Sequence, residues 1–491
     1  MIKIGNTIEK TQRNFWNACV FHPTDAVEDP WGRRILDRMA EDGAIETVRI
    51  YTMFEDILYL DENGQMKYDF RLSDLRLDYM VEKGYDLLLA YGGMPDCIAS
   101  RTDAKTSVSK NKTRYKGKMW NSTPPRDYAL WEELCYEYTR HIVERYGIER
   151  VSAWHMQCFN EPDIPAFFLS DLAPQNWQER LAAYCKLYEA FEKGVRRVSD
   201  RIKIGGPALA WNCNFLGGFM DYIKEKSLKL DFISVHNYGT DPDHINSCKR
   251  PLSVGNNMER QREYARTMRE HGFENTPLIV DEWGGASHGF FNKEECPGLM
   301  FRENEIFSAY YAKLVHDLTM SDLKMEKLII CLSGQHEMVE DFSGFRNFFT
   351  LNFIRKPIYN AHLLSARLKN DLLMAEAENE HLSVLATGDK GGYAVLLCYS
   401  DTYFTEALPM RTDHLSLPDR AMGKQVTVWC IDRENTNPYR LYEKMGLPEM
   451  TEEILHRLRE EGNMKPVLKT VYSDPIPLSF SPNAVYLVTA E

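Results

Sequence analysis

Short apolar segments alternate with longer amphipathic ones from about residue 15 to about residue 370. The apolar segments are hydrophobic throughout, which is typical of strands that are covered on both faces. This pattern predicts eight buried strands, at 15–21, 47–52, 86–93, 151–160, 203–209, 232–239, 277–285 and 327–334.

The segments between these strands predict helices. Residues 127–146 follow the amphipathic period and start at Asp127, a good N-cap residue. Residues 177–199 do so after Asn176, with Glu179 three positions on, as in a capping box. Eight strand-then-helix units with right-handed crossovers close into a barrel. An open doubly wound sheet is the alternative, but no GxGxxG follows the first strand to support it.

Beyond about residue 370 the pattern changes to short strands with tight turns and one clear helix, at 450–461. Such a pattern is typical of a small β-sandwich. The predicted fold class is therefore α/β, a (β/α)₈ TIM barrel with a C-terminal β-sandwich domain. We expect the catalytic barrel at 13–365 and the sandwich at 366–491, with 1–12 adding a strand to the sandwich.

Composition narrows the choice of partners and compartment. The chain has 491 residues, 44% of them hydrophobic, and a net charge of −13 without any Lys/Arg cluster. This composition argues against nucleic acid and against an anionic membrane as partners. No apolar run of about 18 residues predicts a membrane span, and the polar N-terminus carries no signal core. The 11 cysteines are scattered without a CxxC pair, so we expect free thiols and a cytoplasmic protein.

Two glutamates stand at the ends of predicted barrel strands. Glu161 ends the fourth strand and Glu282 ends the seventh, and the active site of such a barrel lies at the carboxyl ends of its strands. The two carboxyl groups would therefore face each other across the barrel mouth. Glycoside hydrolysis uses such a pair: one carboxylic acid protonates the leaving oxygen, while the other carboxylate attacks the anomeric carbon or activates a water.

Other strand ends supply candidate helpers. Asn160 can hydrogen-bond a sugar hydroxyl, and Arg49 and Tyr238 are suited to keep Glu282 ionised. Each residue taken alone has a plainer explanation, since a strand-end Glu is often a solvated rim charge and Arg49 can simply bridge a carboxylate. The conjunction at the fourth and seventh strands is what favours catalysis. No HExxH or P-loop is present, so we expect neither a metal nor a cofactor.

At these residues the sequence resembles glycoside hydrolase family 39 of clan A, the family of β-xylosidases and α-L-iduronidases. The resemblance runs through VRIYTMFEDILYLDENG, GGMPDCIAS, STPPRDYALWEEL, FNEPD, IGGPAL, DFISVHNYG, IVDEWGG, KPIYNAHLL and IDRENTNPYRLYEKMG. The last of these motifs lies in the predicted sandwich, where similarity between barrels alone would not extend.

The resemblance implies a retaining exo-glycoside hydrolase of the β-xylosidase-like branch. It implies that Glu161 is the general acid/base and that Glu282 is the nucleophile of a covalent glycosyl-enzyme intermediate. It also implies that Asn160, His236 and Tyr238 line the sugar subsite. The implied partner is a glycoside or oligosaccharide, and the habit of the family is compatible with a homo-oligomer.

The pocket walls depart from the family pattern. The Arg-Phe-His of strand two reads Arg49-Ile50-Tyr51, the Trp before Asn-Glu-Pro is Phe159, and the aromatic end of strand eight reads Cys-Leu-Ser-Gly at 331–334. We expect Arg49, Tyr51, Phe159 and Trp283 to contact substrate. Because three walls differ, the sugar can be an arabinoside, galactoside, glucoside or uronide instead of a xyloside.

A rival function from another class is a catalytically silent carbohydrate-binding homologue, and a transglycosidase is an intermediate case. The altered walls favour loss of turnover, whereas the intact carboxylate pair favours an enzyme. A panel of aryl glycosides separates the two.

Overall fold

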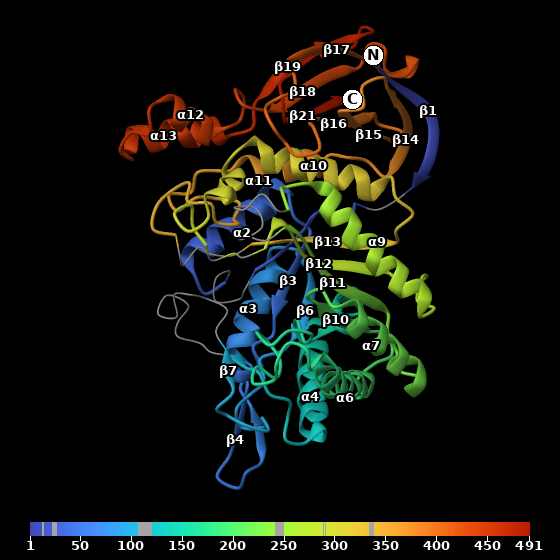
Figure 1. Ribbon diagram of the computed structural model, residues 1–491, viewed down its shortest axis with the longest axis vertical. Coiled ribbons are helices and arrows are strands. Elements are labelled where there is room, and N and C mark those ends of the chain that lie inside the picture. The colour runs from blue at the N-terminus through green and yellow to red at the C-terminus, as the bar shows by residue number, and fades with distance from the viewer. Residues whose placement is uncertain are drawn as a thin grey trace.

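The computed structural model describes residues 1–11, 14–21, 27–106, 120–240, 250–287, 289, 291–332 and 338–491. Within them, eight parallel strands close a barrel, and a helix follows each strand in the chain (Figure 1). The barrel strands are β2 (Ala18–Val20), β3 (Thr47–Tyr51), β6 (Asp86–Tyr91), β9 (His155–Cys158), β10 (Lys203–Leu209), β11 (Phe232–Thr240), β12 (Leu278–Ala286) and β13 (Met325–Cys331). The helices between and after them are α2 (Pro30–Asp42), α3 (Arg71–Glu82), α4 (Tyr128–Tyr146), α6 (Trp177–Arg196), α7 (Cys213–Lys226), α9 (Val254–Glu270), α10 (Glu305–Thr319) and α11 (Pro357–Ser365).

Several short elements lie in the loops of the barrel. They are the ribbons β4 (Leu58–Leu60) with β5 (Met66–Tyr68) and β7 (Lys105–Thr106) with β8 (Trp120–Asn121), the short helix α5 (Ile148–Val151), and the 3₁₀ turns η1 (Phe54–Asp56) and η2 (Pro297–Glu303). None of the helices in the described ranges is both long and apolar enough to cross a membrane.

Of the two helix N-caps predicted from the sequence, the structure confirms one and contradicts the other. Asp127 caps α4 as predicted, because its side chain accepts a hydrogen bond from the backbone N–H of Ala129. α6 begins at Trp177 as expected, but the side chain of Asn176 makes no capping hydrogen bond to the helix. The predicted capping box at Asn176 is therefore wrong. The amide of Asn176 instead donates to the carboxylate of Glu179, at 3.4 Å.

The last part of the chain, with the first strand, forms a mixed sheet. Its order, within the residues that the structure describes, is β19-β18-β21-β16-β15-β14-β1-β17-β20. The bounds are β1 (Ile2–Thr11), β14 (Asp371–Ala377), β15 (Leu382–Gly388), β16 (Tyr393–Tyr399), β17 (Arg411–Ser416), β18 (Gln425–Ile431), β19 (Pro466–Val471), β20 (Ile476–Phe480) and β21 (Ala484–Ala490). Between these strands lie η3 (Asp419–Ala421), α12 (Pro438–Lys444) and α13 (Glu452–Gly462), so the sequence pattern missed α12.

This sheet curls on itself to make its own core. Phe480 of β20, at one end of the strand order, packs against Tyr399 of β16 and Tyr486 of β21, with ring centroids 6.0 and 5.0 Å away. A flat sheet could not bring these strands together, so its two halves face each other as the layers of a sandwich. The fold class predicted from the sequence is confirmed.

The sheet rests on α10 of the barrel (Figure 1). Glu305, at the start of α10, is buried and accepts hydrogen bonds from Arg440 (2.8 Å) and Asn437 (2.7 Å). Both partners belong to the motif IDRENTNPYRLYEKMG, which thus joins the sheet region to the barrel. A domain division between residues 365 and 366 remains our proposal, and residues 12 and 13, at the other proposed boundary, lie outside the described part of the chain.

Candidate active site

Most of the side chains singled out from the sequence gather at the carboxyl-terminal end of the barrel. Arg49 lies on β3, Glu161 follows the end of β9, His236 and Tyr238 lie on β11, and Glu282 lies on β12. In the parallel pairing of β11 with β12, His236 stands opposite Glu282. Four separate strands therefore bring their polar groups to one place.

An irregularity in β12 turns two successive acidic side chains toward the same guanidinium. The register of β12 against β13 shifts between Val280 and Trp283, which breaks the usual alternation of faces. As a result, Arg49 contacts Glu282 (Nη1 to Oε1, 2.8 Å) and also Asp281 (Nη2 to Oδ2, 3.2 Å). Trp283 then points out of the barrel.

The carboxylate of Glu282 accepts several hydrogen bonds. Its Oε1 accepts from Arg49 and from the Tyr51 hydroxyl (3.2 Å), and its Oε2 accepts from the Tyr238 hydroxyl (2.8 Å). The Cys331 thiol lies 3.5 Å from the same Oε2. The expectation that Arg49 and Tyr238 both reach Glu282 is confirmed. Donors on both oxygens favour the ionised form of this group.

The charges around Glu282 act in the same direction. Burial by itself would raise the pKa of the Glu282 carboxyl, but the positive charges of His236, Arg49 and Arg346 and the Tyr238 hydrogen bond hold this pKa well below its usual range. Glu282 is therefore ionised across the whole neutral range.

Glu161 has the opposite environment. Burial raises the pKa of its carboxyl above the ordinary value, even though the charge of His236 opposes the rise. His236 Nδ1 lies 2.7 Å from Glu161 Oε1. The backbone of Glu161 has a φ of 45°, and that of Phe159 a φ of 66°, so this strand end is held in the left-handed region that side chains rarely adopt. The N–H of Glu161 donates to the carbonyl of Ala208 at 3.0 Å and fixes the turn against β10.

These two carboxyl groups are close together and have pKa values shifted in opposite directions. A carboxylate oxygen of each lies within 4.8 Å of the other and of a ring nitrogen of His236. The glutamate side chains are 15% and 11% exposed, so a ligand can reach both. A short separation between two carboxyl groups whose pKa values are shifted in opposite directions suits a double displacement, which needs about 5–5.5 Å, rather than an inverting reaction at about 6.5–9.5 Å.

A buried polar network lies beneath the pair. The guanidinium of Arg49, which is fully buried, donates to Gln157 Oε1 (3.0 Å) and to Asn160 Oδ1 (2.7 Å). Gln157 in turn donates to Asp281 (2.7 Å) and Ser234 (2.6 Å). Arg49 thus links the strand end that carries Glu161 with the strand that carries Glu282, and it limits the freedom of both.

Two predicted substrate contacts are not found where they were expected. Phe159 is buried and packs edge to face on Phe168, with ring centroids 5.3 Å apart. Trp283 is fully buried and stacks on Tyr311 of α10 at 5.7 Å. Both are core residues between the strands and the helices, so assigning them to the sugar subsite was wrong. Of the strand-eight wall, residues 333 and 334 lie outside the described residues.

The sequence reasoning missed several residues of the site. Asp281 and Gln157 are polar residues inside apolar strands, a signal that was available in the sequence. Arg346 gave no such signal, because it comes from a loop after β13. Its Nη1 donates to the Tyr238 hydroxyl at 2.7 Å, so it supports the same hydroxyl that donates to Glu282.

Glu161, His236 and Glu282 are near enough to share one metal ion. The surrounding cations oppose this use, because the Arg49 guanidinium already contacts Glu282 and Arg346 adds a second positive charge nearby. The cluster is better suited to moving a proton and holding a carboxylate nucleophile than to binding a cation.

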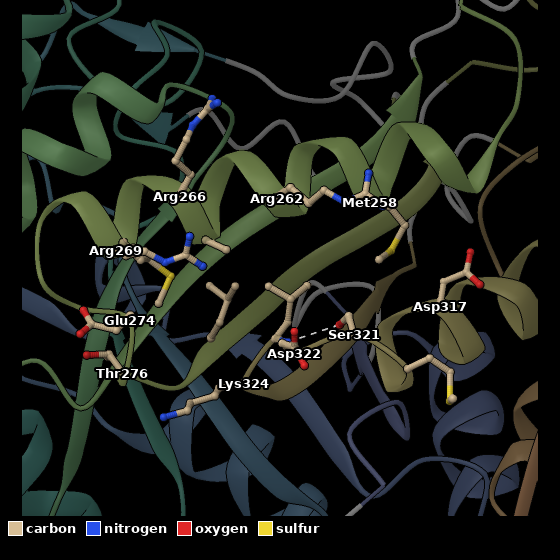
Figure 2. A pocket seen from close by; sticks show the side chains of 15 residues that line it. Met258, Arg262, Arg266, Arg269, Glu274, Thr276, Asp317, Ser321, Asp322 and Lys324 are labelled. Atoms are coloured by element: carbon tan, nitrogen blue, oxygen red, sulfur yellow. Dashed lines mark hydrogen bonds between the residues drawn. The ribbon is translucent and has the colours of Figure 1, made fainter. Parts of the chain in front are cut away.

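A separate cleft of about 620 Å³ lies at the other end of the barrel. Figure 2 shows it under α9, with Arg262, Arg269, Glu274, Asp317 and Lys324 around it. It reaches Leu278, the first residue of β12, and the residue before β13. The cleft is therefore at the amino-terminal ends of the strands, away from the carboxylate pair.

Replacing Arg49 by glutamine is expected to move the acidic limb of the kcat/KM profile to higher pH. Glu282 would lose a cation that lowers its pKa, so its protonated, unreactive form would persist to higher pH. Breaking the buried pair should also lower the free energy of unfolding by about 3–5 kcal/mol. Urea unfolding and a pH series measure the two effects.

The control for this variant is Arg76→Gln. Arg76 is equally buried and pairs with Glu28 and Asp56 at 2.6 and 2.7 Å, outside the cluster of Glu161, His236 and Glu282. It should lose stability without moving the acidic limb. If the acidic limb also stays in place in Arg49→Gln, that result would contradict the role given to Arg49.

Comparison with known proteins adds an independent line of argument. The model of the family described as glycosyl hydrolases family 39 matches residues 2–477. A β-xylosidase of Caldicellulosiruptor saccharolyticus is 25% identical over 473 residues, covering 91% of this chain and 88% of the relative. An α-L-iduronidase of Homo sapiens is 26% identical over 302 residues, covering 55% of this chain and 39% of the relative. Among solved structures, a monomeric β-xylosidase from Caulobacter crescentus CB15 superposes with a TM-score of 0.83 at 18% identity, over 100% of this chain and 99% of that one.

Proposed function

Because this chain belongs to glycosyl hydrolases family 39 and is thus a retaining glycoside hydrolase, we propose that Glu282 is its nucleophile and Glu161 its general acid/base. The observation that carries the proposal is the pair itself: two adjacent carboxyl groups, one with a lowered and one with a raised pKa. Such divergence assigns acid and base roles to carboxyl groups in general.

In the first step, a carboxylate oxygen of Glu282 attacks the anomeric carbon, and the bond to the leaving oxygen breaks. The Glu161 carboxyl donates its proton to that oxygen, which leaves as an alcohol. In the second step, Glu161, now a carboxylate, takes a proton from water, and the water oxygen attacks the anomeric carbon. Glu282 is released with its electron pair, and the sugar keeps its original configuration.

The hydrogen bonds around Glu282 have separate tasks in this scheme. Arg49 and Tyr238 hold its two oxygens, so the carboxylate is oriented before substrate arrives. His236, which lies between the two glutamates, has a pKa that burial would lower but that the charges of Glu282, Asp281 and Glu161 hold above the ordinary value. A charged His236 donates from Nδ1 to Glu161 and stabilises the carboxylate that forms when the proton leaves.

We propose a terminal β-xyloside as the substrate. Support comes from the β-xylosidases among the relatives, which match most of this chain. The test is release of nitrophenol from aryl xyloside, arabinoside, galactoside, glucoside and uronide donors. The highest kcat/KM on the xyloside would support the proposal. A higher kcat/KM on another donor would overturn the xyloside assignment in favour of that donor's sugar. No release from any donor would favour a carbohydrate-binding homologue without turnover.

The two pKa shifts predict a broad bell-shaped pH profile. The acidic limb, set by Glu282, should lie below the ordinary glutamate value, and the alkaline limb, set by Glu161, above it. Activity is lost at low pH because the nucleophile is protonated, and at high pH because the acid is ionised. Measuring kcat/KM between about pH 3 and pH 10 checks both limbs. In Glu161→Gln the alkaline limb should disappear, and a limb that survives would belong to another group.

We also propose a reducing compartment, and hence the cytoplasm. The cysteines that the structure describes are free thiols, and most of them are buried, including Cys19, Cys135 and Cys398. Buried cysteines outside disulfides are usual in proteins of a reducing compartment. Expression of the protein in a reducing and in an oxidising compartment, followed by counting of the free thiols in the purified protein, tests this.

A further inference from the structure

One exposed aromatic residue lies in a loop that is hydrogen-bonded to the segment of the proposed acid/base. Trp211 is 55% exposed and comes two residues after the end of β10, before α7 begins. The backbone of Glu161 is bonded to that same strand end, through the carbonyl of Ala208. A single exposed apolar residue is ordinary on a protein surface, but the backbone around this one is fixed by hydrogen bonds on both sides.

The loop that carries Trp211 is fixed by a buried carboxylate. Asp163, two residues after Glu161, accepts hydrogen bonds from the backbone N–H groups of Ala210 (2.8 Å), Trp211 (3.0 Å) and Asn212 (3.0 Å). Asp163 itself is buried. The segment after Glu161 and the segment around Trp211 are therefore one rigid unit.

The loop is also held from its other side. The carbonyl of Trp211 accepts from Arg260 of α9 at 3.3 Å, and the side chain of Asn212 caps α7 through the N–H groups of Asn214 and Phe215. The backbone around Trp211 is thus bonded in both directions while its indole stays exposed. Little backbone entropy therefore remains to be lost when a ligand covers that indole.

The chemistry places the leaving group on this side of the site. Glu161 must give its proton to the leaving oxygen, so the leaving group lies next to Glu161, whereas the sugar ring whose glycosidic bond breaks lies over Glu282. β11 separates β10, which leads to Trp211, from β12, which carries Glu282. Trp211 therefore stands on the side of the leaving group.

We propose that Trp211 is the platform of a leaving-group subsite that binds a pyranose ring. The apolar face of a sugar ring stacks on an indole, and this contact removes apolar surface of both partners from water. This inference rests on the proposed glycosidase function and deepens it, because it makes the enzyme selective for a sugar, rather than a small alcohol, as the leaving group.

The test compares three donors that share one glycosyl group, namely the β-xylosyl fluoride, the p-nitrophenyl β-xyloside and β-1,4-xylobiose. If the aryl panel shows a different preferred sugar, the same three donors of that sugar are used. Fluoride has no group to stack on the indole. Trp211→Ala should lower kcat/KM on the disaccharide about tenfold, with the fluoride unchanged within about twofold. Trp211→Phe should keep most of the disaccharide activity, because a ring face remains.

The matched control is Tyr403→Ala, because Tyr403 is 56% exposed but lies in the C-terminal sheet region. It should leave the three donors unchanged. An unchanged ratio of disaccharide to fluoride activity in Trp211→Ala would overturn the subsite, and so would an equal fall on both donors. A wild-type enzyme that is silent on every donor would instead overturn the proposed function, and the inference with it.

Discussion

Glu282→Ala is expected to lower the turnover of every glycoside by on the order of 10⁵-fold, which is the size of loss seen when a nucleophile is removed. Without its carboxylate no glycosyl-enzyme intermediate can form. The substitution also leaves Arg49 and Tyr238 without the oxygens to which they now donate, at 2.8 Å each. Initial rates on a p-nitrophenyl glycoside, with circular dichroism to confirm folding, measure the effect.

Azide makes this expectation specific to a nucleophile. A small anion can occupy the space that the Glu282 side chain vacates and attack the anomeric carbon directly. Activity should recover in part, and the glycosyl azide should have the configuration opposite to that of the substrate, because only one displacement has occurred. Glu225→Ala is the control, since Glu225 lies on α7 with a 71% exposed side chain and should show no change. Full activity in Glu282→Ala, or a rescued product of retained configuration, would contradict the assignment.

Glu161→Ala should separate the two chemical steps. Donors whose leaving groups need no proton, such as dinitrophenyl glycosides, should still form the intermediate. Hydrolysis of the intermediate then lacks its base and should slow by about 10²–10⁴-fold, the usual contribution of a general acid/base. Donors with poor leaving groups should lose both steps. The reason is that the pKa of Glu161 is raised overall, whereas that of Glu282 is lowered, which suits Glu161 to the proposed role of proton donor.

A burst experiment measures this separation. Rapid release of one equivalent of dinitrophenol, followed by a slow steady state, is the expected result for Glu161→Ala. Mass spectrometry should show the intermediate on the peptide that contains Glu282. The absence of a burst together with an equal loss on all donors would mean that Glu161 supports the fold or binding rather than proton transfer.

The barrel and the meeting of Glu161 with Glu282 at one end of it could be predicted from the sequence because their signals are local. Continuous apolar runs marked all eight barrel strands. Glu161 and Glu282 followed from their position at the ends of such runs, and Arg49 and Tyr238 from their position on neighbouring strands. None of these steps required knowing which face a side chain takes.

The wrong predictions concern residues whose role depends on the direction in which the side chain points. Trp283 was expected to contact substrate, but the register shift in β12 sends it to the outer core against Tyr311. Phe159 stands in a left-handed turn that the sequence does not reveal, and its ring packs on Phe168. A bulge or a positive φ is set by the surrounding structure, so alternation along a strand cannot predict it.

The contacts between residues far apart in the sequence could not be predicted for a different reason. Arg346 joins the site from a loop, 108 residues along the chain from Tyr238, whose hydroxyl it contacts. Asp163 holds the backbone of Trp211 from 48 residues away. Neither pair has a spacing or motif that marks it, because the contact exists only once the barrel closes.

The stereochemistry of the first-formed product tests the central claim most directly. The proposed nucleophile and the proposed acid/base each have one carboxylate oxygen within 4.8 Å of the other's, and a close pair of carboxyl groups leaves no room for a water between nucleophile and sugar. Proton NMR of the wild-type reaction, recorded in the first minutes before mutarotation, should show the product anomer with the configuration of the substrate. An initial product of inverted configuration would contradict the account, since Glu282 would then be a base that activates water and no glycosyl-enzyme intermediate would exist.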